Sequence, residues 1–260
     1  EIDTTAAGAV TKTGTAAEPP STTVSISDLN DVTIAEKYEG VLITVETLTV
    51  SDSDAGYGEW IAEDSAGNTF LVDDFLTDFY VYDGDTIDAL TGVLHFTYDN
   101  YKLEPRDSND FFGYTSSITK ASDLNVGDIV ITEIMAAPKT DVSGNSCSND
   151  DGEYIEVYNA TSTMLDLRDL FFQDANDLNN GTGTTVSARA LVPAGGYAVG
   201  IHTGSANCYG ITESFELGFN LNNNGDSVYV SYANLTIDAT TYSSTAVTDG
   251  AALQLDSSTT

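Results

Sequence analysis

Short apolar runs that alternate with polar residues constrain the fold of this chain more than any other feature. From Val24 onward these runs have a period of two and are rich in β-branched and aromatic residues, as in 41–45, 70–72, 93–96, 129–134, 154–158 and 228–232. Turns with Asp or Asn before Gly separate them, at Asp83-Gly84, Asp151-Gly152, Asn180-Gly181 and Asn224-Gly225. The pattern predicts an all-β protein, with a turn or two of helix within 27–38.

The runs fall into two groups, and we predict one domain from each. The length of 260 residues accommodates two ordinary domains, here 31–113 and 128–260. Residues 114–127 carry no strong apolar pattern and are predicted to be a linker. Small residues and threonine dominate 1–30, which we expect to form an extended N-terminal arm. No internal repeat relates the two groups.

The first group contains five strand-like segments and a distinctive closing sequence. The segments are 38–45, 58–64, 70–74, 84–87 and 90–94, and the closing sequence is Tyr101-Lys102-Leu103-Glu104-Pro105-Arg106. This series resembles the OB-fold-like domains of secreted bacterial proteins, which often lie beside nucleases and phosphatases. The resemblance implies an OB-like Greek-key barrel of five strands.

The second group contains five motifs in a fixed order, 129–135, 152–159, 165–167, 192–197 and 221–228. Their order and spacing resemble the lamin-tail domain over roughly residues 127–256. The resemblance implies an immunoglobulin-like β-sandwich, of a kind that serves adhesion, anchoring or assembly in secreted bacterial proteins. One departure from the family pattern is the insertion from Lys139 to Asp151.

The charge balance excludes two classes of partner. Lys and Arg number 8 against 41 Asp and Glu, which gives a formal net charge of −33. So few basic residues cannot neutralise nucleic-acid phosphates, and an anionic membrane would repel the surface. We also expect no membrane insertion, since no apolar run approaches the roughly 20 residues needed to span a bilayer. Salt or divalent cations would relieve the self-repulsion, so the charge favours a saline or calcium-rich exterior.

The two cysteines, Cys147 and Cys208, lie in loop-like contexts. A bridge that closes so long a loop is worth roughly 3–4 kcal/mol in the chain-entropy model, so we expect a disulfide and therefore secretion. A metal or catalytic pair is the alternative, but CxxC spacing and a nearby His are both missing. Because the chain begins at Glu1 with neither Met nor a leader, we interpret position 1 as a processed N-terminus, with an expression fragment as the alternative.

Loops rich in Asp and Asn make calcium the candidate cofactor, because hard cations prefer oxygen ligands. The candidate ligands are Asp141, Asn145, Asn149, Asp150 and Asp151 in one loop, and Asp174, Asn176 and Asp177 in the other. Neither loop matches an EF-hand. Solvated turn residues without a metal are the alternative for both.

Motifs for covalent or phosphate chemistry are missing from the sequence. It contains no GxSxG, HExxH, P-loop or GxGxxG, so we predict a protein that is not an enzyme. Carboxylate pairs such as Asp73-Asp74 are expected by chance among 41 acids and do not by themselves indicate a glycosidase.

Two further sets of residues concern binding and modification. The aromatic residues of the first group are candidates to stack on sugars or bases, although alternation turns about half of them inward: Tyr57, Trp60, Phe70, Tyr98 and Tyr101. Glycosylation sequons begin at Asn159, Asn180 and Asn234, which makes glycans candidate partners.

These features predict a non-catalytic extracellular structural subunit that self-assembles into a filament or surface layer. In this hypothesis the arm, through Ile2, Val10 and Val24, adds to a sheet edge of a neighbouring copy and builds a head-to-tail homopolymer. A tail packed along its own domain is the alternative for the arm. The alternative for the whole chain is the accessory or binding portion of a larger secreted nuclease, phosphatase or carbohydrate-binding protein.

Overall fold

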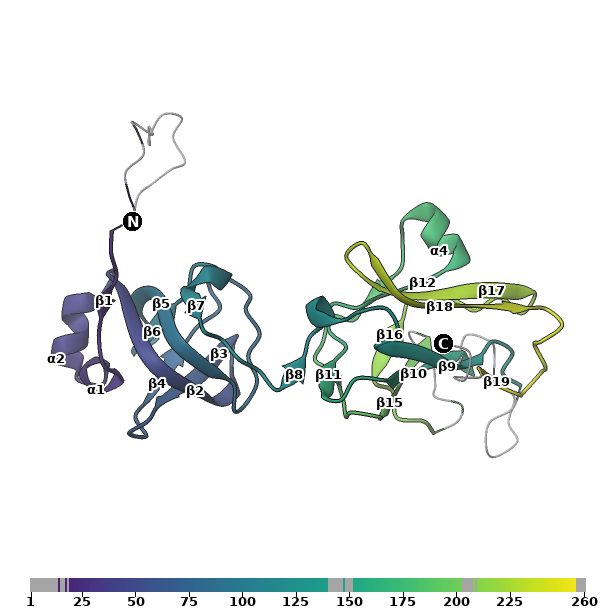
Figure 1. Ribbon diagram of the computed structural model, residues 1–260, viewed down its shortest axis with the longest axis horizontal. Coiled ribbons are helices and arrows are strands. Elements are labelled where there is room, and N and C mark those ends of the chain that lie inside the picture. Colours follow the sequence, from purple (N-terminus) through teal and green to yellow (C-terminus); the bar gives the residue numbers. More distant parts are fainter. Residues whose placement is uncertain are drawn as a thin grey trace. The chain divides into compact units, whose positions relative to one another are not determined.

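The computed structural model describes residues 14, 17, 19–139, 147, 152–202, 208 and 210–255. Strands make up 46% of the structure and helices 11%, which confirms the all-β class. The chain divides into two compact units, Glu1–Ser116 and Ser117–Thr260 (Figure 1). No helix in the described ranges is long and apolar enough to cross a membrane.

The first unit is a closed barrel of five strands. These are β2 (Leu42–Gly56), β3 (Glu59–Asp64), β4 (Thr69–Val72), β5 (Thr86–Thr97) and β6 (Asn100–Glu104). The order is β2-β3-β4-β6-β5, and pairing of β5 with β2 closes the ring. β4 and β6 run parallel, whereas the other neighbours are antiparallel. This Greek-key connectivity confirms the predicted OB-like barrel (Figure 1).

Short elements surround the barrel. They are β1 (Thr22–Thr23), α1 (Ile26–Leu29), α2 (Val32–Ala35), η1 (Glu36–Tyr38), η2 (Ser108–Asp110) and β7 (Phe111–Phe112). Ser25 begins α1, because its hydroxyl accepts a hydrogen bond from the Asp28 amide at 3.1 Å. Alternation along the barrel strands turns Trp60, Leu94 and Leu103 into a core that also includes Ile26.

The structure corrects the predicted length of the arm. Val24 is 5% exposed and belongs to the core of its own barrel, and its amide donates to the Thr44 carbonyl at 2.9 Å. β1 pairs with β2 in parallel, and Leu29 is buried. Val24 therefore does not belong to a free arm. Burying its apolar side chain in the adjacent barrel core lowers the free energy more than leaving it exposed to water would. Ile2 and Val10 lie outside the described residues.

The predicted linker 114–127 is also shorter than expected. Within it, β8 (Ile118–Thr119) pairs with the second unit, and Ala121 and Leu124 are buried in that unit's core. The units divide between Ser116 and Ser117. The sequence pattern missed these contacts because the apolar residues are spaced irregularly.

The second unit is an immunoglobulin-like β-sandwich, as predicted. One sheet has the order β16 (Phe215–Leu217), β15 (Tyr197–His202), β10 (Tyr154–Asn159), β9 (Ile129–Met135), β19 (Leu253–Gln254). Another has the order β13 (Thr184–Thr185), β12 (Phe171–Asp174), β17 (Gly225–Tyr232), β18 (Leu235–Ser243). A small sheet contains β14 (Leu191–Val192), β11 (Met164–Asp166) and β8, and the short helices are η3 (Ala121–Asp123) and α4 (Ala175–Asn180).

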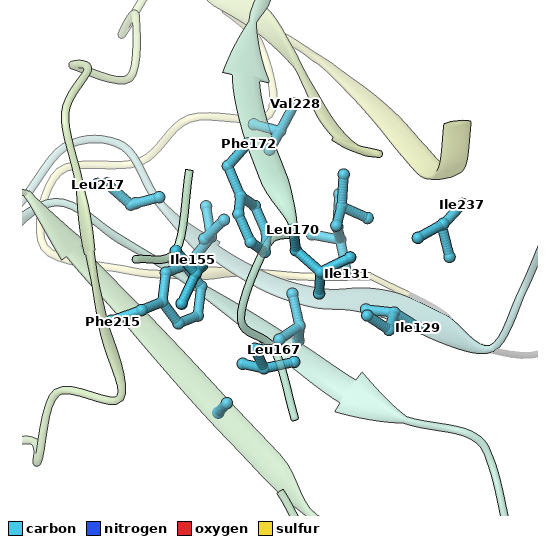
Figure 2. Packing of buried hydrophobic residues seen from close by; sticks show 14 of the residues in the cluster. Ile129, Ile131, Ile155, Leu167, Leu170, Phe172, Phe215, Leu217, Val228 and Ile237 are labelled. Atoms are coloured by element: carbon cyan, nitrogen blue, oxygen red, sulfur yellow. The ribbon is translucent and has the colours of Figure 1, made fainter. Parts of the chain in front are cut away.

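Figure 2 shows how the sheets of the sandwich share one core. Ile131 and Ile155 from one sheet meet Phe172 and Val228 from another, and each is at most 2% exposed. The rings of Phe172 and Phe215 stack with centroids 4.6 Å apart. Full burial of each such side chain contributes about 1.5–3 kcal/mol, so the shared core helps to hold the sheets of the sandwich together.

Candidate functional site

A cleft of about 880 Å³ lies against the outer face of the barrel. Its lining comes from the turn between β2 and β3, the segment after β4, and the hairpin of β5 and β6: Ala55, Tyr57, Glu59, Asp73, Asp74, Phe75, His95, Thr97, Tyr98, Asn100, Lys102 and Glu104. Lys102 and Glu104 flank the inward-facing Leu103 on β6 and so face away from the barrel core.

The floor of the cleft holds a buried ammonium group. Lys102 is 3% exposed, and its Nζ donates to Glu59 Oε1 and, at 3.0 Å, to Asp73 Oδ2. Burial alone would lower the pKa of Lys102, but the hydrogen bonds to Glu59 and Asp73 outweigh it and raise the pKa. Lys102 therefore stays charged and is held between two carboxylates.

Glu104 is the second buried charge of the floor. Its side chain is 3% exposed, and Oε1 lies 3.1 Å from His95 Nδ1. Its other oxygen, Oε2, is buried without a hydrogen-bond partner among the described residues. Burial raises the pKa of Glu104, and the hydrogen bond from His95 offsets part of that rise.

Asp74 forms one wall of the cleft and depends on a glycine. A Cβ at Gly58 would overlap the Asp74 carboxylate, and Gly58 has φ +85°, so a larger residue there would be strained as well as displaced. Burial, and then the nearby charges of Asp73 and Asp78, raise the pKa of Asp74. Asp74 is thus, after Glu104, a second carboxylate of the cleft whose raised pKa indicates that its negative charge is not fully balanced by nearby positive groups.

Three exposed aromatic rings form the rim. Tyr57 is 100% exposed, Tyr98 88% and Phe75 75%. The Lys102 Nζ lies 5.7 Å from the centroid of the Tyr98 ring, and the Phe75 ring lies 6.4 Å from that of His95. The Tyr98 ring therefore lies near the Lys102 ammonium, and the Phe75 ring lies near His95.

Both rim tyrosines occupy left-handed backbone. Tyr57 has φ 59° between Gly56 and Gly58, and Tyr98 has φ 49° in the two-residue turn between β5 and β6. Bulky residues are rare there, because Gly, Asn and Asp adopt this conformation at lower cost. Backbone strain of this kind lowers the stability of the folded state, and it clusters at functional sites. The positive φ angles of the two tyrosines are therefore a reason to examine the cleft as a binding site.

The sequence predicted part of this site. Tyr57 and Tyr98 lie on the rim, whereas Trp60 and Phe70 are 4% and 7% exposed and pack in the core, in line with the expected division by alternation. Tyr101 packs against the core from outside and donates to Glu36 at 2.6 Å. Phe75 and the buried charges were not predicted. Lys102 could have indicated them, because it lies in an alternating strand of a chain with few basic residues.

A second groove of about 920 Å³ lies on the sandwich and includes Asp174 and Asn176. Asp174 begins α4, since its Oδ1 accepts from the Asp177 amide at 2.5 Å. Burial, followed by the nearby Asp226, raises the pKa of Asp174. Tyr242 also lines the groove, and its buried hydroxyl has no partner in the part of the chain that the structure describes.

The calcium prediction is untested by this geometry. The structure places Asp174, Asn176 and Asp177 at the start of a short helix instead of a loop. Among the described residues no group of three or more His, Cys, Asp or Glu is arranged to hold a metal ion. The other predicted loop, with Asp141, Asn145, Asn149, Asp150 and Asp151, lies outside those residues.

Cys147 and Cys208 form a disulfide, as predicted, with their Cα atoms 6.1 Å apart. The bond joins two points 61 residues apart in the sequence of the second unit. It therefore constrains the sandwich and not the barrel.

The structure separates the three sequons. Asn159 is 2% exposed, and its amide nitrogen lies 2.9–3.1 Å from the carbonyl oxygens of Thr163, Val192 and Pro193. Asn159 is therefore excluded as a glycosylation site in the folded protein, because its side chain is enclosed and hydrogen-bonded. Asn180, at the end of α4, and Asn234, in the turn between β17 and β18, are exposed.

The fold and the cleft together define a modular all-β protein, with an open cleft on the barrel and a sandwich of the binding or structural kind. The family model of the Lamin Tail Domain matches residues 123–244. That span agrees with the sandwich, and the lamin-tail domain is a non-catalytic immunoglobulin-like structural domain. The chain matches no curated protein and no solved structure.

Proposed function

We propose that this chain is a non-catalytic extracellular structural protein whose barrel cleft holds a ligand. The lamin-tail match supports the structural part, and the disulfide supports an oxidising, extracellular location. The cleft supports the binding part, since an open cavity with convergent polar groups and aromatic rings is the usual form of a ligand site.

The observation that carries the binding function is the pair of exposed tyrosines held at positive φ, Tyr57 and Tyr98. A turn selected only for stability would have Asn or Gly at these positions. Both rings instead remain open to solvent beside a floor of buried charges, where a ligand can cover them.

The test is a binding panel with a matched pair of proteins. We expect the full chain to bind at least one member of a panel of amines, basic peptides and oligosaccharides. The double variant Tyr57→Gly, Tyr98→Asn should bind that member at least about tenfold more weakly. Equal binding by the two proteins, or no binding to the panel, would contradict a binding function for the cleft.

A second proposal is that copies of the chain assemble through the segment before Pro19. β1 supports this proposal, because it is the outermost strand of the barrel sheet and lies where that segment joins the barrel. An edge strand can accept a further strand through its unpaired backbone groups, and a head-to-tail contact of this kind gives an open polymer.

The truncation that tests assembly must spare the barrel. Removing residues 1–30 would also remove Val24, Ile26 and Leu29 from the core, so the informative variant lacks only residues 1–18. We expect the full chain to form large particles in light scattering and electron microscopy, and the variant to remain monomeric. Particles of the original size from the truncated chain would disprove the arm model.

A further inference from the structure

The cleft carries an excess of negative charge that the residues described by the structure do not balance. Four carboxylates line it, those of Glu59, Asp73, Asp74 and Glu104, against one ammonium, that of Lys102. Lys102 already pairs with Glu59 and Asp73, which leaves Asp74 and Glu104 to be compensated in other ways. An anionic ligand such as a phosphate would meet repulsion from this lining and from the net charge of −33.

Glu104 shows what kind of group is missing. Its Oε2 is buried and accepts no hydrogen bond from the described residues, while its Oε1 is satisfied by His95. A buried carboxylate oxygen is normally paired, and its strongest partners are charged N–H donors. The unsatisfied oxygen therefore calls for a donor that enters the cleft from outside.

The rim fits the same ligand. Tyr57, Phe75 and Tyr98 line the cleft with largely exposed rings, and aromatic faces attract cations through their quadrupoles. Lys102, at 5.7 Å from the Tyr98 ring centroid, already makes one such contact within the protein. Aromatic rings and carboxylates that line the same cleft make up a site for a positively charged organic group.

We propose that the barrel cleft binds an organic cation with N–H donors, an ammonium or guanidinium group. The inference rests on the proposed binding function of the cleft and adds the chemical class of its ligand. A metal ion fits poorly, because the Lys102 ammonium lies between Glu59 and Asp73. A neutral sugar would stack on the rings but leave the charge excess in place.

The experiment is calorimetric titration of the full chain at low ionic strength. The cationic probes are Nα-acetyl-lysine methylamide, Nα-acetyl-arginine methylamide and spermidine, which separate a peptide side chain from a free polyamine. Tetramethylammonium, which has the charge but no N–H, and maltotriose, which has neither, complete the set. We expect a cationic probe with N–H donors to bind most tightly and tetramethylammonium to bind at least about tenfold more weakly.

Three variants complete the test. Glu104→Gln and Asp74→Asn should each weaken binding of the best probe by about tenfold or more. Glu46→Gln removes an exposed carboxylate of β2 that does not line the cleft, and it should change binding by less than about twofold. Far-UV circular dichroism and Trp60 fluorescence verify that each variant is folded.

The outcomes separate this inference from the proposed function. An equal loss with Glu46→Gln would mean diffuse attraction to the acidic surface and would overturn the cation site. Tight binding of maltotriose with none of the cations would overturn the ligand class but keep the cleft as a binding site. No binding of any probe would count against both.

Discussion

At the scale of single residues, Glu104 combines burial of its carboxylate with an unpaired oxygen. A carboxylate that is 3% exposed, with one oxygen unpaired, costs the folded state free energy, since an unsatisfied buried polar group typically costs about 1–3 kcal/mol. The raised pKa of Glu104 expresses the same cost. Between its ordinary pKa of 4.5 and its folded value, the folded state binds more protons than the unfolded state, so stability falls as pH rises through that window.

The first prediction follows from this sign. Glu104→Gln should raise the melting temperature of the barrel at pH 7 by a few degrees, because it removes a buried charge and keeps an acceptor for His95. The gain should shrink as the pH is lowered, because the wild-type carboxyl becomes neutral as the pH falls through its raised pKa. Thermal unfolding of both proteins at several pH values measures it, and a variant that is less stable at pH 7 would contradict the argument.

At the scale of elements, the hairpin of β5 and β6 combines a tight turn with an exposed aromatic ring of the cleft. Its loop consists of Tyr98 and Asp99, with φ 49° and 63°. Two consecutive residues with positive φ favour Asn and Gly strongly over tyrosine. The hairpin therefore keeps an aromatic ring at the cleft at the cost of local strain.

The second prediction is that Tyr98→Asn stabilises the barrel while it weakens ligand binding. We expect a gain of about 0.5–1 kcal/mol from relief of the left-handed tyrosine, less what the contact with Lys102 contributes. Urea unfolding followed by Trp60 emission measures the stability. A loss of stability would mean that the ring is retained for packing instead of binding.

The third prediction concerns α4 and the groove on the sandwich. If calcium occupies this groove, excess chelator lowers the melting temperature of the sandwich by several degrees, because a ligand bound only by the folded state stabilises it. Asp174→Asn should remove the calcium dependence without unfolding α4, since Asn also begins helices well. Identical melting curves with calcium and with chelator would remove the metal from the groove.

At the scale of the whole molecule, the two units have separate cores and separate reporters. Trp60, the one tryptophan of the sequence, lies in the barrel core, whereas the disulfide joins Cys147 to Cys208 in the second unit. Each unit has its own buried cluster. Cooperative unfolding is therefore expected within each unit.

The fourth prediction is that reduction affects only one of two unfolding transitions. Reducing the disulfide should destabilise the sandwich by roughly 3–4 kcal/mol in the chain-entropy model, while the transition seen by Trp60 fluorescence stays unchanged. Circular dichroism follows the sandwich in the same samples. A shift of both transitions together would show that the two units unfold as one.

Local sequence patterns determined the class of this protein. Alternation with a period of two requires only neighbouring residues, so it predicted the strands, the two all-β groups and the division of the aromatic residues between core and surface, in which Trp60 faces the core. The loop contexts of Cys147 and Cys208 likewise predicted their bond. These features depend on residues close in sequence or on the chemistry of a single pair.

Only the tertiary structure decided which polar groups act together. Lys102 meets Glu59 and Asp73, 43 and 29 residues away, because the barrel closes and brings β6 beside the start of β3 and the end of β4. In the same way, Asn159 is buried and donates to the Val192 carbonyl of β14, and Val24 is buried by its own barrel, which no local pattern indicated. Alternation determines which side of a strand a residue faces, but the closing of the sheets determines what lies opposite, and the cleft and its unpaired Glu104 oxygen depend on that second step.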